Sequence, residues 1–180
     1  SLSRNGSTRF LSEFLVRLVH SIVKLNYHFA DQVSPVCYYN TRWERKMGVS
    51  KNKIRVIYNG VDHNVFAPRS KPEGDHGYTV VSVARIDPVK DIKSYIQAAA
   101  IVKTKMPGVK FKLYGSVTVE DYYQECKQLV DELNLKGDFI FEGHTDDPAG
   151  AYQSGDVIVL SSISEAFPYS IVEAMMAGRP

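Results

Sequence analysis

The sequence has few of the residues that build disulfide-rich or metal-binding domains. Its 180 residues include two cysteines, Cys37 and Cys126, which lie far apart in the chain. A disulfide framework or a zinc knuckle uses closely spaced cysteines, so neither is predicted here. We expect both thiols to be free in a reducing compartment.

The sequence also lacks an excess of charge of one sign and a long apolar run. Lysine and arginine number 22 and aspartate and glutamate 20, so a net charge of +2 provides no general field to attract nucleic acid. The best candidate for a membrane span, residues 10–25, is interrupted by Glu13, Arg17, His20 and Lys24. With 44% hydrophobic and 23% charged residues, the composition is typical of a globular domain with a sizeable core.

Residues 10–25 have the spacing of an amphipathic helix. Phe10, Phe14, Leu18 and Ile22 recur every four residues, which is typical of a helix that faces a protein core. The alternative is peripheral contact with an anionic membrane surface through basic residues of the same segment, namely Arg4, Arg9, Arg17 and Lys24.

Apolar strands alternate with helices in the second half of the sequence. Before that half, a helix is predicted at 39–47, a strand at 54–58 and a linker rich in proline and glycine at 67–77. Beyond the linker we expect strands at 79–83, 109–114, 139–142 and 156–160, and helices at 92–104, 121–133 and 170–177. This alternation predicts an α/β fold with a Rossmann-like parallel sheet and helices on both faces.

Parallel sheets bind ligands at the carboxyl ends of their strands, and two cations follow the first of these strands. Arg85 and Lys90 lie in a loop stiffened by Pro88. An arginine fork and a lysine ammonium beside helix amino termini are suited to holding a diphosphate. The alternative is a pair of solvated surface charges.

Two carboxylates, separated by seven residues, flank the start of the last predicted helix. If that helix begins near Tyr169, Glu173 lies about one turn inside it and Glu165 in the loop before it, so both can face one cleft. The alternative, an acid that only complements the helix dipole, explains one glutamate better than two. Backbone N–H groups near the helix start are candidate phosphate donors; they belong to Ala166, Phe167, Tyr169 and Ser170.

Two further loops follow predicted strands, Gly115–Ser116 and Gly143–His144. His144 is a candidate base or nucleobase contact, although a lone histidine is more often structural. No metal site is predicted, because the adjacent Asp146 and Asp147 point apart and no third ligand is near. The glycine-rich fingerprints of dinucleotide-binding oxidoreductases and of P-loop nucleoside triphosphatases are absent from the sequence.

Several motifs occur in a fixed order along the chain. They are residues 57–62 (IYNGVD), 82–85 (SVAR) with Lys90 and Asp91, 141–143 (FEG), 165–173 (EAFPYSIVE) and 178–180 (GRP). This ordered set resembles the retaining glycosyltransferases of family 4, which have the two-lobed GT-B fold. Within that family, segments 85–93, 122–135 and 161–165 are most similar to the Pel-type exopolysaccharide glycosyltransferases.

The resemblance implies roles for the candidate residues. Arg85 and Lys90 would hold the donor diphosphate and stabilise its departing charge without a metal or other cofactor. Glu165 would contact the donor sugar and Glu173 the ribose hydroxyls. The loop at 143–144 would lie at the nucleobase, and the loop at 115–116 would have to stay small.

The resemblance also implies the organisation and activity of the protein. Residues 1–66 would be the end of the acceptor lobe and the hinge, 67–77 a linker, and 78–180 a truncated nucleotide-sugar-binding domain of a protein that is here a fragment, inactive alone. The implied reaction transfers a sugar, with UDP-sugar as the family's usual donor, to a saccharide or polysaccharide acceptor with retention. The implied location is the cytoplasm or the inner membrane face, beside membrane-bound polysaccharide synthase subunits. A two-lobed nucleotide-sugar epimerase and a non-catalytic scaffold subunit are the alternatives.

Overall fold

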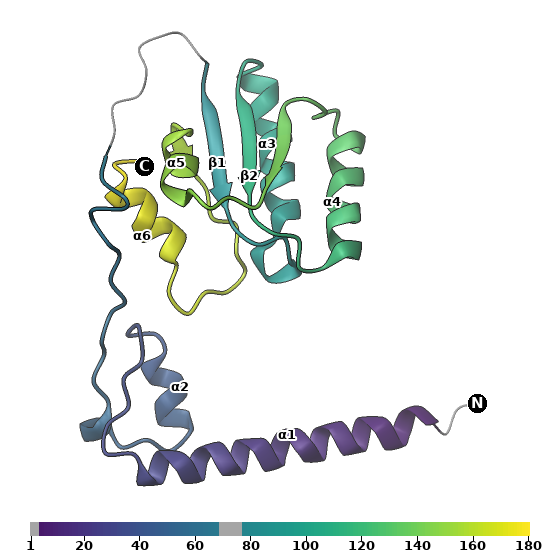
Figure 1. Cartoon of the computed structure of the whole chain (residues 1–180). Helices are drawn as coiled ribbons and strands as arrows, with labels where there is room; N and C mark the ends of the chain where they lie inside the picture. The colour runs from purple at the N-terminus through teal and green to yellow at the C-terminus, as the bar shows by residue number, and fades with distance from the viewer. Residues whose placement is uncertain (1–3, 69–76) are drawn as a thin grey trace. The chain divides into compact units, whose positions relative to one another are not determined.

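The structure is a computed structural model that describes residues 4–68 and 77–180 (Figure 1). Most of the linker expected at 67–77 lies outside these residues. The chain divides into two compact units, Ser1–Asn59 and Gly60–Pro180.

The first unit contains two helices, α1 (Arg4–Phe29) and α2 (Thr41–Lys46), and a short 3-10 turn, η1 (Lys51–Lys53). The strand expected at 54–58 is wrong: the segment forms one parallel bridge, between Val33 and Ile54. The Val33 N–H donates to Lys53 O and the Arg55 N–H to Val33 O. The next donor in the ladder would be residue 35, a proline without an N–H, so the ladder is interrupted there. The Ile57 N–H still donates to the Pro35 carbonyl over 3.1 Å, but no regular strand forms.

Helix α1 is longer than expected, and none of its described apolar side chains is buried. Most of them are about half exposed or more, including Phe14, Leu18, Ile22 and Phe29, whereas Val23 and Tyr27 are partly buried. The expectation of a core-facing helix is therefore wrong for the described side chains, which begin at residue 14. Arg4 and Arg9, two of the basic residues of the membrane-contact alternative, lie outside these side chains. Among the described residues, no helix has both the length and the apolar character needed to cross a bilayer.

The second unit is built on a four-stranded sheet in the order β3-β2-β1-β4, with all neighbouring strands parallel. The strands are β1 (Thr79–Val83), β2 (Lys110–Tyr114), β3 (Phe139–Gly143) and β4 (Val157–Ile158). The helices are η2 (Pro88–Lys90), α3 (Ile92–Lys105), α4 (Glu120–Glu132), α5 (Pro148–Gln153) and α6 (Tyr169–Met176). The predicted α/β fold is confirmed, although β4 is shorter than expected and α5 was not expected.

Each face of the sheet has its own hydrophobic core. Helices α3 and α4 cover one face (Figure 1). In the core beneath them the Tyr95 ring packs edge-on against Phe139, and the Tyr95 hydroxyl donates to the Val80 carbonyl over 2.9 Å. The other core holds side chains of α5 and α6. There the Phe66 and Tyr152 rings lie 6.1 Å apart, so Phe66 packs with the second unit although the sequence grouped it with the first.

Gly115 brings the ends of three strands together. Its N–H donates to the Gly143 carbonyl over 2.7 Å, and a β-carbon at this position would lie 2.0 Å from the Ala84 carbonyl oxygen. Its φ of +154° is also unfavourable for other residues. The backbone after β2 can therefore approach the backbone after β1 only at a glycine.

We expect Gly115→Ala to lower the free energy of unfolding by about 1–3 kcal/mol, because the added methyl group displaces the Ala84 backbone. Gly108→Ala is the matched control, since a β-carbon there meets nothing within 4 Å. Urea unfolding of the two variants measures the difference. Equal stabilities would show that the loop after β1 yields without cost.

Candidate functional site

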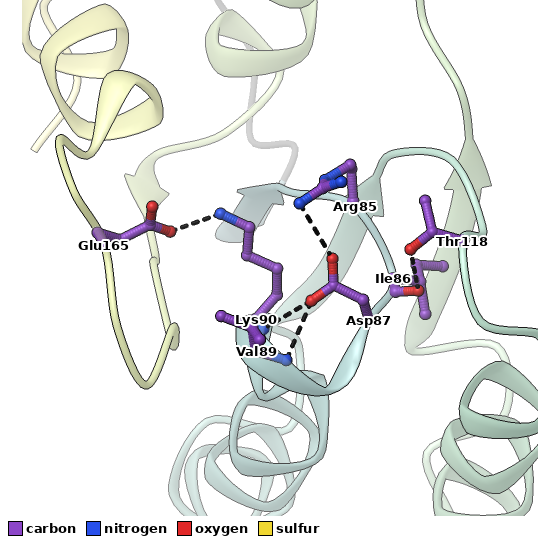
Figure 2. A network of polar contacts seen from close by, with 7 residues as sticks. All are labelled: Arg85, Ile86, Asp87, Val89, Lys90, Thr118 and Glu165. Atoms are coloured by element: carbon purple, nitrogen blue, oxygen red, sulfur yellow. Dashed lines mark hydrogen bonds and ion pairs between the residues drawn. The ribbon is translucent and has the colours of Figure 1, made fainter. Parts of the chain in front are cut away.

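The loop after β1 is shaped by the carboxylate of Asp87. Its Oδ1 accepts hydrogen bonds from the backbone N–H groups of Val89 (3.0 Å) and Lys90 (3.2 Å), which caps η2 (Figure 2). Pro88 occupies the first helical position, where its lack of an N–H has no cost. This cap places Lys90 at the carboxyl edge of the sheet.

Asp87 also contacts the second cation. Its Oδ2 lies 3.4 Å from Arg85 Nη2, and Arg85 is the more exposed partner, with 65% of its side chain accessible against 11% for Asp87. The residue between them fixes the loop: the Ile86 N–H donates to Ser116 O, and its carbonyl accepts from Thr118 Oγ1 over 3.2 Å (Figure 2). One carboxylate thus orders both cations predicted from the sequence.

Lys90 and Glu165 form an ion pair across the sheet edge. Lys90 Nζ lies 2.5 Å from Glu165 Oε1, and the two side chains are 18% and 23% exposed (Figure 2). Two bonds tie the loop after β4 to η2, from Ser161 Oγ to Lys90 O (2.8 Å) and from the Ile163 N–H to Val89 O (2.9 Å). Burial acts to raise the pKa of Glu165, but the hydrogen bond and charge of Lys90 and the charge of Arg85 outweigh it, so this pKa lies below its usual value.

Glu173 is held by a tyrosine that the sequence analysis did not select. Tyr152 Oη, on α5, donates to Glu173 Oε2 over 2.6 Å, and Tyr152 is completely buried. Burial and the neighbouring carboxylate raise the pKa of Tyr152, so its hydroxyl remains a donor. The position of Glu173 on α6 therefore depends on the contact between α5 and α6.

The start of α6 has free backbone donors, but fewer than predicted. The Tyr169 N–H donates to the Phe167 carbonyl over 3.0 Å, so it is already paired. The N–H groups of Ala166, Phe167 and Ser170 have no acceptor within the part of the chain that the structure describes. These three remain available to an anionic ligand.

The loops after β2 and β3 meet at His144. Its Nδ1 lies 3.3 Å from Ser116 Oγ and its Nε2 lies 3.2 Å from Asp146 Oδ1. Gly143, with φ of +80°, makes the turn that leads into this contact. Asp147 instead caps α5 through the Gly150 N–H, and residues 4–68 and 77–180 contain no cluster of ligating side chains that could hold a metal ion.

The structure joins five of the predicted residues at one edge in two groups, and Glu173 is held separately by Tyr152. Arg85, Lys90 and Glu165 are joined through β1 and the loop after β4, and Ser116 and His144 through β2 and β3. The residues that were missed are Asp87 and Tyr152. The Asp-Pro pair is a recognisable cap signal, whereas Tyr152 lies on a helix too short to predict.

A separate cleft of about 480 Å³ lies in the first unit. Tyr38, Arg45, Lys51, Arg55 and Tyr58 are among its lining residues. None of the predicted site residues belongs to it.

Comparison with known proteins identifies related sequences. The family model described as "Glycosyl transferases group 1" matches residues 66–180. The N,N'-diacetylbacillosaminyl-diphospho-undecaprenol alpha-1,3-N-acetylgalactosaminyltransferase of Campylobacter jejuni is 31% identical over 178 residues, which cover 92% of this chain and 45% of that protein. Putative glycosyltransferase EpsD of Bacillus subtilis is 29% identical over 153 residues, 79% of this chain and 39% of that protein. The chain spans less than half the length of these relatives.

Solved structures are similar as well. HepE of Anabaena in complex with UDP has a TM-score of 0.78 and 26% identity, over 87% of this chain and 45% of that one. Sucrose-phosphate synthase of Thermosynechococcus elongatus has a TM-score of 0.78 and 24% identity, over 89% and 42% of the two chains, which supports the fold alone.

The contact between Tyr152 and Glu173 should appear as an energetic coupling. In a double-mutant cycle of Tyr152→Phe and Glu173→Gln, we expect a coupling of about 1.5–3 kcal/mol, because a buried hydroxyl donates to a carboxylate. Tyr95→Phe is the matched control, since it removes another buried tyrosine hydroxyl that bonds to backbone carbonyls in the other core. The control cycle combines Tyr95→Phe with Glu173→Gln, and denaturant unfolding measures both cycles. A coupling of Glu173 to Tyr152 no larger than its coupling to Tyr95 would contradict the contact.

Proposed function

The chain belongs to the group 1 glycosyltransferases, and from this premise we propose that its second unit binds the nucleoside diphosphate of a sugar donor. The whole protein would transfer the sugar to a saccharide or polysaccharide acceptor with retention of configuration. We include in the proposal a UDP-sugar as donor and a role in exopolysaccharide synthesis of the Pel type. The proposed location is the cytoplasmic face of the membrane, beside synthase subunits.

The observation that supports this proposal best is the turn after β1. Arg85 and Lys90 project from one loop whose backbone is fixed by Asp87, at the edge where parallel sheets bind ligands. An arginine fork and a lysine ammonium held in this way match the geometry of a diphosphate. HepE, at 26% identity, was solved with UDP, which supports a uridine nucleotide as the ligand.

The proposed chemistry needs positive charge where the diphosphate departs. The bond between the anomeric carbon and the diphosphate oxygen breaks, and an acceptor hydroxyl oxygen bonds to that carbon from the same face of the sugar. The hydroxyl proton passes to the departing phosphate oxygen. Arg85 and Lys90 would stabilise the charge that develops there, so neither a protein nucleophile nor a metal is part of the proposal.

The remaining residues fit the parts of the donor. We assign Glu165 to the sugar hydroxyls and Glu173, oriented by Tyr152, to the ribose hydroxyls. Ser116 and His144 would lie beside the nucleobase. The free N–H groups of Ala166 and Phe167 would donate to a phosphate oxygen or a sugar hydroxyl.

Calorimetric titration of the full chain with UDP, UDP-glucose and NAD tests the donor class. We expect UDP and UDP-glucose to bind and NAD not to bind. Lys90→Ala should weaken the binding of both uridine ligands by roughly 10- to 150-fold, the equivalent of about 1.5–3 kcal/mol for a hydrogen bond to a charged group.

Lys103→Ala is the matched control. Lys103 is 22% exposed and pairs with Asp138 over 2.7 Å, but it lies on α3 away from the carboxyl edge of the sheet. We expect the affinity of the Lys103→Ala variant for UDP to be unchanged. A change of less than twofold in Lys90→Ala, or equal binding of NAD, would refute the proposed role.

A further inference from the structure

Each of the two cations at the sheet edge already has its own carboxylate. Arg85 faces Asp87 at 3.4 Å, and Lys90 faces Glu165 at 2.5 Å. The formal charges of these four groups sum to zero. A diphosphate that binds here therefore meets two built-in anions as well as two cations.

The two carboxylates differ in how firmly they are held. Asp87 accepts two backbone N–H bonds in addition to its contact with Arg85, so its oxygens are fixed by the fold. Glu165 lies in the loop between β4 and α6, outside any helix or strand. Glu165 is therefore the carboxylate whose surroundings a ligand can change (Figure 2).

We propose that Glu165 competes with a bare nucleoside diphosphate for Lys90 and so makes the site discriminate between the sugar donor and the diphosphate product. This inference rests on the proposed function. A donor brings sugar hydroxyls that donate to the Glu165 carboxylate and replace its bond to Lys90. A bare diphosphate brings no such donors.

The charge of Glu165 itself contributes in the same direction. The terminal phosphate of a nucleoside diphosphate is close to a dianion at neutral pH, because its second pKa lies near 6, whereas the same phosphate esterified to a sugar carries one negative charge. Glu165 therefore repels the terminal phosphate of the bare nucleoside diphosphate more strongly than it repels the same phosphate in the sugar donor. The low exposure of both partners, 18% and 23%, keeps this interaction less screened than at the open surface.

The test is the affinity of Glu165→Gln for UDP and for UDP-glucose, measured by calorimetry on the full chain. We expect the variant to bind UDP about threefold more tightly, because an anion that competes with the ligand is removed. It should bind UDP-glucose more weakly than the wild-type protein. If Glu165 only supported the shape of the site, its replacement would weaken the binding of both ligands.

Asp138→Asn is the matched control. Asp138 pairs with Lys103, the two side chains are 20% and 22% exposed, and it precedes β3 at the opposite edge of the sheet. It should change neither affinity. Should Glu165→Gln fold poorly, Glu165→Asp withdraws the carboxylate from Lys90 while keeping its charge, and its UDP affinity should also rise.

The outcomes separate this inference from the function on which it rests. Absence of UDP and UDP-glucose binding in the wild-type protein overturns both. Wild-type binding of UDP that is unchanged or weakened in the Glu165 variants overturns the inference and leaves the proposed function standing. Tighter UDP binding with weaker UDP-glucose binding supports it.

Discussion

The geometry of the candidate site depends on one carboxylate, that of Asp87. One oxygen caps the turn that presents Lys90, and the other contacts the guanidinium of Arg85. This cap thus fixes the positions of two cationic side chains after the end of β1. Loss of this carboxylate would remove the cap of η2 and the contact with Arg85, and it would leave the Val89 N–H without its acceptor.

The sheet supplies the second constraint, which is close approach. Parallel strands bring the loops after β1, β2 and β3 to one edge. Gly115, which has no β-carbon, allows the backbone after β2 to approach the backbone after β1 closely. The loop after β4 is joined to the same edge by hydrogen bonds to the η2 backbone. The Asp87 carboxylate is fixed by two backbone N–H groups, whereas Glu165 lies on a loop outside any helix or strand. This difference in support underlies the inferred part of Glu165 in discrimination.

Much of the second unit could be predicted because its signals are local. Short segments rich in β-branched and aromatic residues, followed by charged or glycine-containing loops, identified β1, β2 and β3. The position of Arg85 and Lys90 after β1 identified the candidate anion site. The short helix α5 has six residues and little periodicity, so neither it nor Tyr152 could be selected. The hydrogen bond to Glu173 joins residues from two helices and has no signature in the sequence.

The first unit was harder to predict for a different reason. A strand needs a partner that can donate in return, and Pro35 removes that donor opposite the segment at 54–58. The periodicity of residues 10–25 predicts a helix, and this segment is helical, but periodicity indicates only that an apolar face exists. The structure leaves Phe14 and Ile22 more than half exposed, so the expected burial did not follow from the pattern.

The central claim is that one edge of the sheet binds a nucleoside diphosphate. The most direct test is a ¹⁵N chemical-shift titration of the chain with UDP. We expect the shifted amides to belong to the loops after the four strands and to the start of α6, with the largest changes around Lys90. Shifts at the opposite edge of the sheet or in the first unit alone, or no shifts in folded protein, would contradict it.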